Sequence, residues 1–502
     1  MTAQTEEVSP GEQARAWVAR RDPARWTLGA VIVVWSLTFI ILGFQRHDRY
    51  GTFGFDLGTY DQGIWLLSQL KHPFVTIRGL HLFGHHVNFI LYLLAPFYRL
   101  GAGPHFLLVV QVLSQASGAI AIFLLARDRL KSRWLAVAMG TALLLHPTSG
   151  WLAWEFFHPD ALAIGPLLFA YWAARAGRWR WFTVAAAAAI LCKEDVAFSM
   201  AMIGVLIFFR GNRRIGAVTA LASLAWYELS TKVILPANNH IAAFYNTFFG
   251  DLGESPFAVL KSFFTKPNEI RRLLRMDDRR DYTVMMLAPM AFLPLASLST
   301  FLIAVPMLAI NLLSTFPYQR EIRYHYAALV LVGVMVATVE AIANLGERPG
   351  FRRFLVGLVM ASSLATTVAW GNAPISVKFH NGIWSLGADA RRQAKHDALG
   401  LIPKHDSVSA IYYMAPHLTH RTKVYEFPNP WKVVNWGVRG ENPDDPGGVK
   451  WLILDRQLLS AEDRELLHTL LTTEFQLRYD HNDILVARRT HPPGPDSPKP
   501  PS

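Results

Sequence analysis

The sequence predicts an α-helical polytopic membrane protein followed by a small α/β domain. The composition is strongly apolar: 52% of the 502 residues are hydrophobic and only 17% are charged, whereas soluble domains contain about 25% charged residues. Apolar segments near the length needed to cross the ~30 Å hydrocarbon core recur over residues 27–372. From residue 373 the apolar runs become shorter and alternate with polar residues, as in a soluble domain.

Residues 27–372 are expected to contain about eleven membrane-spanning helices. The apolar segments lie at residues 27–44, 104–126, 134–152, 160–177, 182–209, 215–235, 284–315, 326–345 and 354–371. Segment 182–209 holds three consecutive charges, Lys193-Glu194-Asp195, so we expect two helices joined at these residues. Two prolines and a Ser-Leu-Ser sequence divide segment 284–315, which is also expected to form two helices.

The loops between these segments indicate the orientation, because cytoplasmic loops carry an excess of lysine and arginine. The basic residues that mark the expected inner side are Arg15, Arg20, Arg21, Arg25, Arg127, Arg129, Lys131, Arg133, Arg178, Arg180, Arg210, Arg213, Arg214, Arg348, Arg352 and Arg353. An odd number of spans then places the basic tail 1–26 inside and the C-terminus outside. No apolar core precedes Trp26, so we expect no cleavable signal peptide and a multi-pass location in the cytoplasmic (plasma) membrane.

Two long outer loops are expected, at residues 45–103 and 236–283. The first contains an amphipathic stretch at 60–70 and an apolar stretch at 87–98, which is too short to span and suits a helix in the interface. The second contains a basic helix, Lys261 to Arg275, expected near lipid headgroups.

Residues 373–490 are expected to form an extracytoplasmic α/β domain. A helix is expected at Ala388 to Leu399, and the tail 491–502, rich in proline and serine, is expected to be disordered. The expected strands are Ser407 to Tyr413, Lys423 to Phe427, Trp451 to Asp455 and Phe475 to Val486.

Charge and cysteine content exclude two classes of function. The formal net charge is +12, but the basic residues lie in short clusters between apolar spans, which is typical of loops at an anionic leaflet. Membrane lipids are therefore expected partners and nucleic acid is not. The single cysteine, Cys192, excludes an intrachain disulfide and a thiolate metal site.

Chemically functional side chains gather in segments expected at the outer face. These acids, histidines and cations are Asp56, Asp61, Arg78, His81, His85, His86, Glu155, His158, Asp160, Lys193, Glu194, Asp195, Arg320, Glu321, Arg323 and His325. A carboxylate can deprotonate a hydroxyl or amine, and cationic side chains bind phosphate. This convergence predicts an active site for a lipid-borne substrate, with ion coupling as the alternative.

Each of these groups also has a structural interpretation. Asp56 or Asp61 can cap the helix expected near Tyr60, and Asp160 suits the first turn of a helix. The pair His85-His86 can be polar residues entering an interface helix. The charges at 193–195 can pair with one another at a hairpin tip, and Arg320 and Arg323 can anchor headgroups.

Two histidines of the first outer loop have the spacing of metal ligands. His81 and His85 stand four residues apart, as helical zinc ligands do. The neighbouring Gly79 and Gly84 disfavour a helix there, so no metal site is assigned. A divalent cation held by acids near Asp56 stays an open alternative.

Several motifs, in the same order, resemble the DUF2079 family of bacterial and archaeal membrane proteins. The resemblance covers about residues 30–490, and the family is similar in layout to the GT-C class of membrane glycosyltransferases. The motifs are Phe55-Asp56-Leu57-Gly58-Thr59-Tyr60-Asp61-Gln62, Phe157-His158-Pro159, Cys192-Lys193-Glu194-Asp195, Pro317-Tyr318-Gln319-Arg320 and Ala415-Pro416-His417-Leu418-Thr419-His420-Arg421.

The GT-C resemblance implies a polyprenyl-phosphate sugar donor and a catalytic acid in the first outer loop, with a tyrosine four residues later. Asp56 and Tyr60 have this spacing, so the resemblance implies Asp56 as general base, with Asp61 second. Leu57 stands where some members have a second acid, so a metal requirement is not implied.

The resulting hypothesis is an inverting membrane glycosyltransferase that transfers a sugar from a polyprenyl-phosphate lipid to an envelope glycan or protein acceptor. The expected substrate- and phosphate-binding residues are Tyr60, Arg78, His85, His86, His158, Lys193, Glu194, Tyr318, Arg320 and Arg323. The alternative is a non-catalytic transporter, lipid-handling or envelope-assembly protein. A transporter would favour charges in mid-helix and repeated halves, and the sequence has neither.

Overall fold

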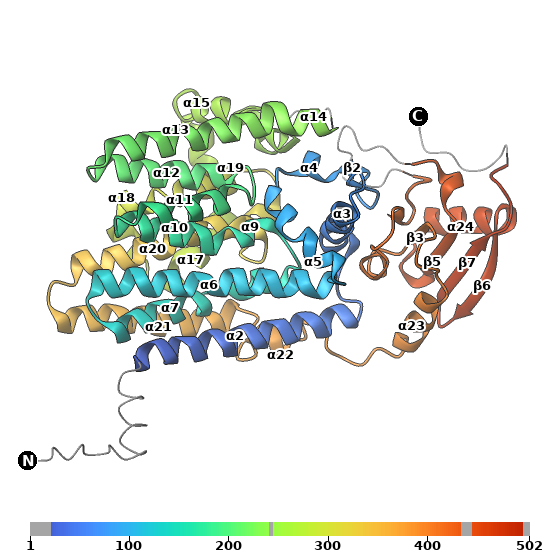
Figure 1. Ribbon diagram of the computed structural model, residues 1–502, viewed down its shortest axis with the longest axis horizontal. Helices are drawn as coiled ribbons and strands as arrows, with labels where there is room; N and C mark the ends of the chain where they lie inside the picture. The colour runs from blue at the N-terminus through green and yellow to red at the C-terminus, as the bar shows by residue number, and fades with distance from the viewer. Residues whose placement is uncertain (1–21, 240–243, 433–443, 495–502) are drawn as a thin grey trace, which may run out of the picture.

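The computed structural model describes residues 22–239, 244–432 and 444–494. Figure 1 shows a bundle of helices with a small sheet at one of its ends. Most of the expected N-terminal tail, 1–26, and most of the expected disordered tail, 491–502, lie outside the described residues. We call residues 23–370 the helical part and residues 392–489 the sheet part.

Among the described residues, four stretches of helix are long and apolar enough to cross a membrane. Helix α2 begins at Pro23, where the Asp22 side chain accepts a hydrogen bond from the Ala24 N–H, as an N-cap does. Helix α20 is the central one, with every residue from Ala328 to Ile342 buried. The four stretches are α2 (Pro23–Asp48), α6 (Pro104–Leu130), His325–Leu345 with α20 (Ala328–Leu345), and α21 (Pro349–Trp370).

A fifth span exists if two bent helices are counted together. Helices α7 (Arg133–Leu145) and α8 (Pro147–Trp154) meet at an angle of 47°. Pro147 causes the break, because proline lacks the N–H that would continue the helix.

The expectation of about eleven spans is therefore met only in its coarse form, a helical membrane protein. The remaining apolar segments form shorter helices: α9 (Pro159–Leu162), α10 (Ile164–Arg175), α11 (Trp179–Ile190), α12 (Val196–Phe209), α13 (Arg213–Leu229), α17 (Asp277–Leu287), α18 (Leu298–Phe301) and α19 (Val305–Leu313). The chain does break between α11 and α12 at Lys193-Glu194-Asp195, as expected. Segment 284–315 is more fragmented than the two helices expected there. Its prolines start short 3₁₀ turns, and Ala291 and Phe292 have positive φ.

The segments between α2 and α6 and between α13 and α17 consist of short elements. The expected amphipathic stretch 60–70 is helix α3, and the expected interface helix 87–98 is a 3₁₀ turn followed by α5. The expected basic helix from Lys261 to Arg275 is divided before Pro267. These elements are α3 (Thr59–Ser68), β1 (Phe74–Val75), β2 (Leu80–His81), α4 (Leu82–His85), α5 (Ala95–Arg99), α14 (Leu235–Asn239), α15 (Pro256–Thr265) and α16 (Pro267–Leu274).

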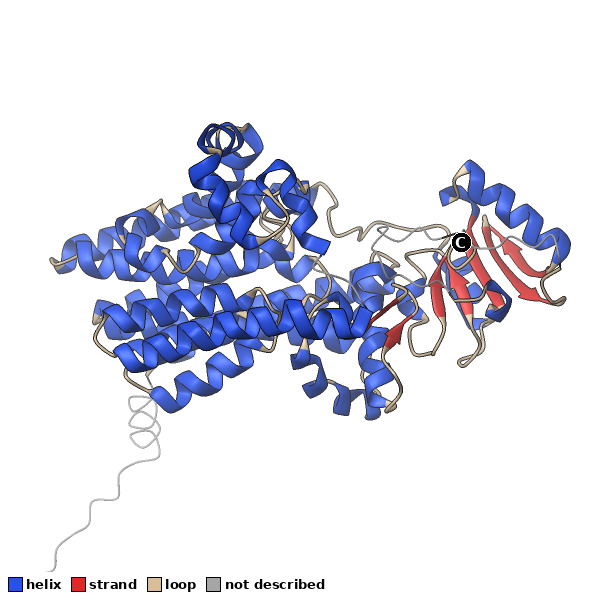
Figure 2. Ribbon diagram, turned by 90° about the horizontal axis from the view of Figure 1, so that it is seen from above, coloured by secondary structure: helices blue, strands red, loops and turns tan. Residues whose placement is uncertain are grey.

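The sheet part has five strands in the order β4-β3-β5-β7-β6, seen at one end of the molecule in Figure 2. Strand β3 is parallel to β4 and β5, and β7 is antiparallel to β5 and β6. Helix α23 packs against β7 and α24 against β6. The elements of the sheet part are α23 (Arg392–Gly400), β3 (Val408–Ala410), β4 (Val424–Glu426), β5 (Trp451–Asp455), α24 (Ala461–Thr473), β6 (Phe475–His481) and β7 (Ile484–Arg489). The short helix α22 (Val377–His380) precedes the sheet part and packs against α21.

The expectation of one strand from Phe475 to Val486 is wrong. The segment is a hairpin, because Asn482 and Asp483 have φ of 50° and 63° and turn the chain between β6 and β7. Asn and Asp tolerate this left-handed region better than other residues, and a two-residue hairpin turn requires it. The Asn-Asp pair was the sequence signal for the turn.

The sheet part is joined to the helical part through strand β4 and the segment before it. The Thr76 hydroxyl, next to β1, donates to the Val424 carbonyl at 2.7 Å, and the Val424 N–H donates back at 2.9 Å. The Gln62 amide donates to the carbonyls of Arg421 and Thr422, each at 3.3 Å. These bonds hold β4 against the loop that contains Asp56.

Candidate functional site

A pocket of about 420 Å³ lies where the helical part meets strand β4. It is rich in aromatic rings and contains three carboxylates and four histidines contributed by well-separated segments of the chain. The lining residues are Phe53, Phe55, Asp56, Tyr60, His85, His86, Glu155, His158, Phe316, Tyr318, Tyr324, His325, Tyr326 and Glu426. A mostly apolar hollow with a few convergent polar groups is the usual form of a small-molecule site.

Asp56 lies in a π-helical turn, Gly54–Gly58, at the pocket wall. Its side chain is 29% exposed, and its Oδ1 is 3.5 Å from Nε2 of His158. Glycine is required at position 54, since a Cβ there would come within 2.4 Å of the Glu426 carboxylate. Asp56 is thus reachable from the pocket and has an imidazole beside it.

Glu155, His158 and His325 form a compact group next to Asp56. His325 Nδ1 is 2.9 Å from Glu155 Oε1, and the rings of His158 and His325 stack with centroids 4.0 Å apart. Burial raises the pKa of Glu155 well above its usual value, and the charges of Asp56 and Asp160 add to this shift. One nitrogen from each histidine and one carboxylate oxygen all lie within 4.8 Å of one another, so this group can hold a metal ion.

Glu426 is the pocket residue that the sequence did not indicate. It ends strand β4 and brings a carboxylate from the sheet part to the helical part. Burial raises its pKa to about 8, and the nearby charge of Asp56 contributes to that increase. No local motif marks it, because it is 370 positions from Asp56 and only the docking of β4 places it here. Glu155 and His325 were recognised as outer-face residues but were assigned no role.

The raised pKa of Glu426 makes the stability of the protein depend on pH. Its folded-state pKa of about 8 exceeds the usual 4.5, so the folded state binds the extra proton between these values. Stability is therefore complete below about pH 4.5 and falls as the pH rises toward 8. We expect Glu426→Gln to raise the free energy of unfolding at pH 9 by about 2 kcal/mol, with little effect at pH 5. Thermal unfolding in detergent at both pH values measures this; an equal effect at both would contradict the assignment.

His85 and His86 line the pocket opposite a buried charge cluster. His86 Nδ1 is 2.7 Å from Glu194 Oε1, while Glu194 Oε2 accepts the Val87 N–H at 3.0 Å. His85 Nδ1 has no hydrogen-bond partner among the described residues. Burial lowers the pKa of both histidines well below the usual value. Both imidazoles are therefore neutral and have one N–H each; that of His86 is donated to the Glu194 carboxylate, so His85 is the one that can donate into the pocket.

Lys193 and Glu194 lie behind the pocket wall. Lys193 Nζ is 3.0 Å from Asp160 Oδ1 and 3.3 Å from Asp195 Oδ2, so its charge is balanced by carboxylates. Glu194 orients His86. Neither Lys193 nor Glu194 lines the pocket; Glu194 affects it by positioning the His86 ring, which does line it.

Asp61 lies outside the pocket. It is fully buried and accepts hydrogen bonds from the Tyr98 hydroxyl, at 2.5 Å, and from the Thr419 hydroxyl. His420 Nε2 is 3.2 Å from Oδ2 of Asp61, the same oxygen that accepts the Thr419 hydrogen bond. Asp61 thus joins α3 to the sheet part.

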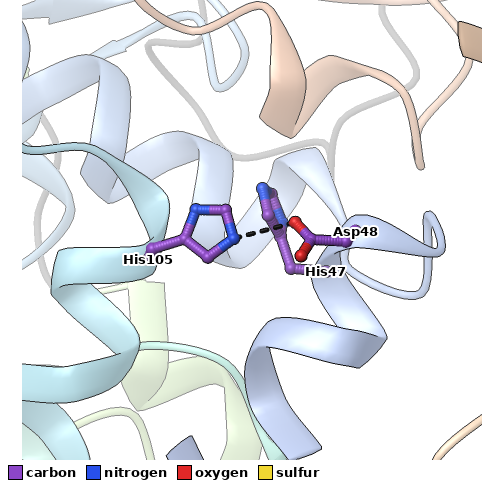
Figure 3. Close-up of side chains that lie close together, drawn as sticks. All are labelled: His47, Asp48 and His105. Atoms are coloured by element: carbon purple, nitrogen blue, oxygen red, sulfur yellow. Dashed lines mark hydrogen bonds and ion pairs between the residues drawn. The ribbon is translucent and has the colours of Figure 1, made fainter. Parts of the chain in front are cut away.

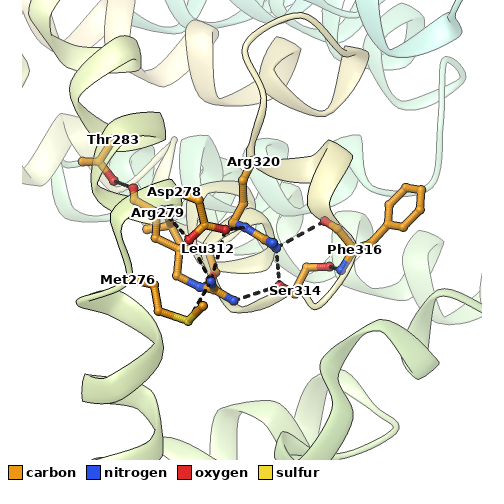
Figure 4. Close-up of polar contacts among 8 residues, drawn as sticks. All are labelled: Met276, Asp278, Arg279, Thr283, Leu312, Ser314, Phe316 and Arg320. Atoms are coloured by element: carbon orange, nitrogen blue, oxygen red, sulfur yellow. Dashed lines mark hydrogen bonds and ion pairs between the residues drawn. The ribbon is translucent and has the colours of Figure 1, made fainter.

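Three arginines that were predicted to bind substrate or phosphate do not line the pocket. Arg78 is buried, with its guanidinium 4.9 Å from the centre of the Phe55 ring. Arg320 donates to Asp278 at 2.6 Å and to the carbonyls of Ser314 and Phe316, as Figure 4 shows. Arg323 pairs with Glu321. In this structure Arg320 holds its own loop against α17.

The model of a protein family described as "Predicted membrane protein (DUF2079)" matches residues 46–486. The chain belongs to the DUF2079 family. No curated protein matches it in sequence.

Solved structures show a shared fold at low sequence identity. This DUF2079 chain superposes on apo ArnT from Cupriavidus metallidurans with a TM-score of 0.52 and 14% identity, over 95% of this chain and 98% of that one. For ArnT from Cupriavidus metallidurans bound to undecaprenyl phosphate, the values are 0.50 and 13%, over 97% and 100%. The Archaeoglobus fulgidus oligosaccharyltransferase gives 0.39 and 13%, over 86% and 70%. The two ArnT superpositions show that the fold of this DUF2079 chain resembles that of ArnT.

The pocket contains the kinds of side chain that the transfer of a group to a hydroxyl requires. A partly exposed carboxylate, Asp56, can accept a proton. A neutral His85, whose Nδ1 has no hydrogen-bond partner among the described residues, can donate an N–H to an oxyanion. The aromatic rings supply flat apolar surfaces on which a ring-shaped substrate can lie.

Proposed function

We propose that this DUF2079 protein is an inverting membrane glycosyltransferase. It takes a sugar from a polyprenyl-phosphate lipid and transfers it to an envelope glycan or protein acceptor at the outer face of the cytoplasmic membrane. The observation that carries the proposal is Asp56, a partly exposed carboxylate in an aromatic pocket where the helices meet the sheet part. The fold similarity to ArnT, solved with undecaprenyl phosphate, supports the lipid class.

In the proposed reaction, Asp56 accepts the proton of the acceptor hydroxyl. The freed oxygen attacks the anomeric carbon of the donor, and the bond from that carbon to the phosphate oxygen breaks. The electron pair leaves with the polyprenyl phosphate, whose charge the pocket must stabilise. A single displacement of this kind inverts the configuration at the anomeric carbon.

His85 is proposed to donate its N–H to the phosphate, with the His86 ring beside it at 4.5 Å between centroids. Tyr60 and Tyr318 are proposed to line the sugar site. His158, 3.5 Å from Asp56, holds the base in position. Lys193 and Glu194 support His86 from behind. The contacts of Arg320 and Arg323 favour a structural role for both.

The direct test is transfer of radiolabelled sugar from a panel of polyprenyl-phosphate donors by membranes that contain the native protein. Membranes without the protein are the control. Transfer that requires the protein supports the enzyme. Absence of transfer from every donor, together with normal folding, favours the transporter or envelope-assembly alternative.

Lipid-phosphate binding gives a separate prediction. We expect the purified protein to bind undecaprenyl phosphate, and His85→Ala to weaken this binding about tenfold, the loss expected for one hydrogen bond to a charged group. Titration followed by native mass spectrometry measures the affinity. His396→Ala, whose side chain is 79% exposed on α23, is the matched control. Unchanged affinity in His85→Ala would remove His85 from the phosphate site.

A further inference from the structure

A second group of metal-binding side chains lies outside the pocket, where α2, α6 and the sheet part meet. His47 and Asp48 are the last two residues of α2, and His105 is the second residue of α6. Figure 3 shows the three side chains side by side. One ligand atom from each lies within 4.8 Å of the other two. None of the three lines the pocket around Asp56.

Two hydrogen bonds orient the histidine rings of this group. His105 Nε2 is 2.8 Å from Asp48 Oδ1. His47 Nδ1 is 2.8 Å from the Thr52 hydroxyl. When Nδ1 donates its hydrogen to that hydroxyl, Nε2 of His47 presents its lone pair. A ligating histidine is commonly held in this way, with its second nitrogen donating to a neighbouring oxygen.

The surroundings of the group suit an ion that is sheltered on one side and open on the other. The ring of His417, from the sheet part, stacks on His47 with centroids 4.2 Å apart. Asp48 and His105 are 50% and 43% exposed, which gives an ion a path from solvent.

We propose that His47, Asp48 and His105 bind a zinc ion. Two imidazole nitrogens and one carboxylate oxygen form a common zinc ligand set, and the fourth position remains for water. Imidazole ligands favour zinc over magnesium or calcium. The ion would join the end of α2 to the start of α6. Asp48, the last residue of α2, is eight positions before Asp56 in the chain. The proposal does not depend on the proposed glycosyltransferase activity.

The test is zinc binding by the full-length protein purified in detergent with a histidine-free tag. The protein is stripped with a chelator, titrated with zinc sulfate, and its bound zinc is measured by mass spectrometry. We expect His105→Ala and Asp48→Asn each to lower the bound zinc by one ion per chain. Thr52→Val, which removes only the hydrogen bond to His47, is expected to weaken zinc binding at least tenfold.

Two control variants separate this site from others. His325→Ala removes a ligand of the group beside Asp56, and His396→Ala removes an exposed histidine; both are expected to retain the zinc lost in His105→Ala. If the native protein binds no zinc, or if His105→Ala and Thr52→Val bind it as the native protein does, the proposal is overturned. If His105→Ala does not fold, the zinc affinity of Thr52→Val still tests the proposal, because that variant keeps all three ligand residues.

Discussion

Replacing Asp56 with asparagine is expected to lower sugar transfer by about 10²- to 10⁴-fold, the usual contribution of a general base. Asparagine has nearly the same size but cannot accept the hydroxyl proton. The carboxylate is partly exposed and its ionic contact is the 3.5 Å approach to His158, so the fold should tolerate the change. The measurement is incorporation of radiolabelled sugar by membranes with matched amounts of each protein.

Asp281→Asn is the matched control for Asp56→Asn. Asp281 lies on α17 with its side chain 60% exposed, so this change removes an acid far from any pocket residue in sequence and should leave transfer unchanged. Equal transfer by Asp56→Asn and the native protein would exclude Asp56 as the base. Glu155 and Glu426, the other two carboxylates of the pocket, would then be the next residues to replace.

Replacing Asp61 with alanine is expected to destabilise the protein by about 3 kcal/mol. The carboxylate is fully buried and accepts hydrogen bonds from Tyr98 and Thr419. Its removal takes this partner from the buried Tyr98 hydroxyl and leaves Thr419 only its 3.2 Å bond to the Pro416 carbonyl. Because Thr419 belongs to the sheet part, we also expect faster proteolysis of that part. Thermal unfolding in detergent and limited proteolysis measure the two effects.

Tyr98→Phe provides the comparison for Asp61→Ala. It removes one hydrogen bond and keeps the ring, so it should cost about 1 kcal/mol. An Asp61→Ala protein that is as stable as the native one but inactive in transfer would reverse the interpretation. Asp61 would then act in catalysis, as the sequence had allowed.

Composition and hydropathy predicted the helical membrane body and the small α/β domain, because both depend on the average polarity of long segments. The same averages overestimated the number of long spans. Hydropathy does not register where a helix breaks, and the breaks at Pro147 and at Ala291-Phe292 depend on single residues. The motifs predicted the DUF2079 family, which the family match confirms.

The pocket was only partly predictable. It contains six of the twelve predicted site residues: Asp56, Tyr60, His85, His86, His158 and Tyr318. The sequence shows which side chains are charged but not which are already paired, so Asp61, Lys193 and Arg320 were grouped with reactive residues although each has buried or local partners. Glu426 was missed because its position depends on a contact between segments far apart in the chain.

The position of Glu426 has a consequence for biosynthesis. Proteins are made from the N-terminus, and segments generally fold in that order. The helices and Asp56 precede the sheet part. Among the described strands, β4 pairs with β3, β3 also pairs with β5, and β5 pairs with β7 at Ile484–Arg489. The ribosome must therefore translate almost the whole message before the sheet can form and close the pocket. A prematurely terminated chain can occupy the membrane, but it lacks a complete site.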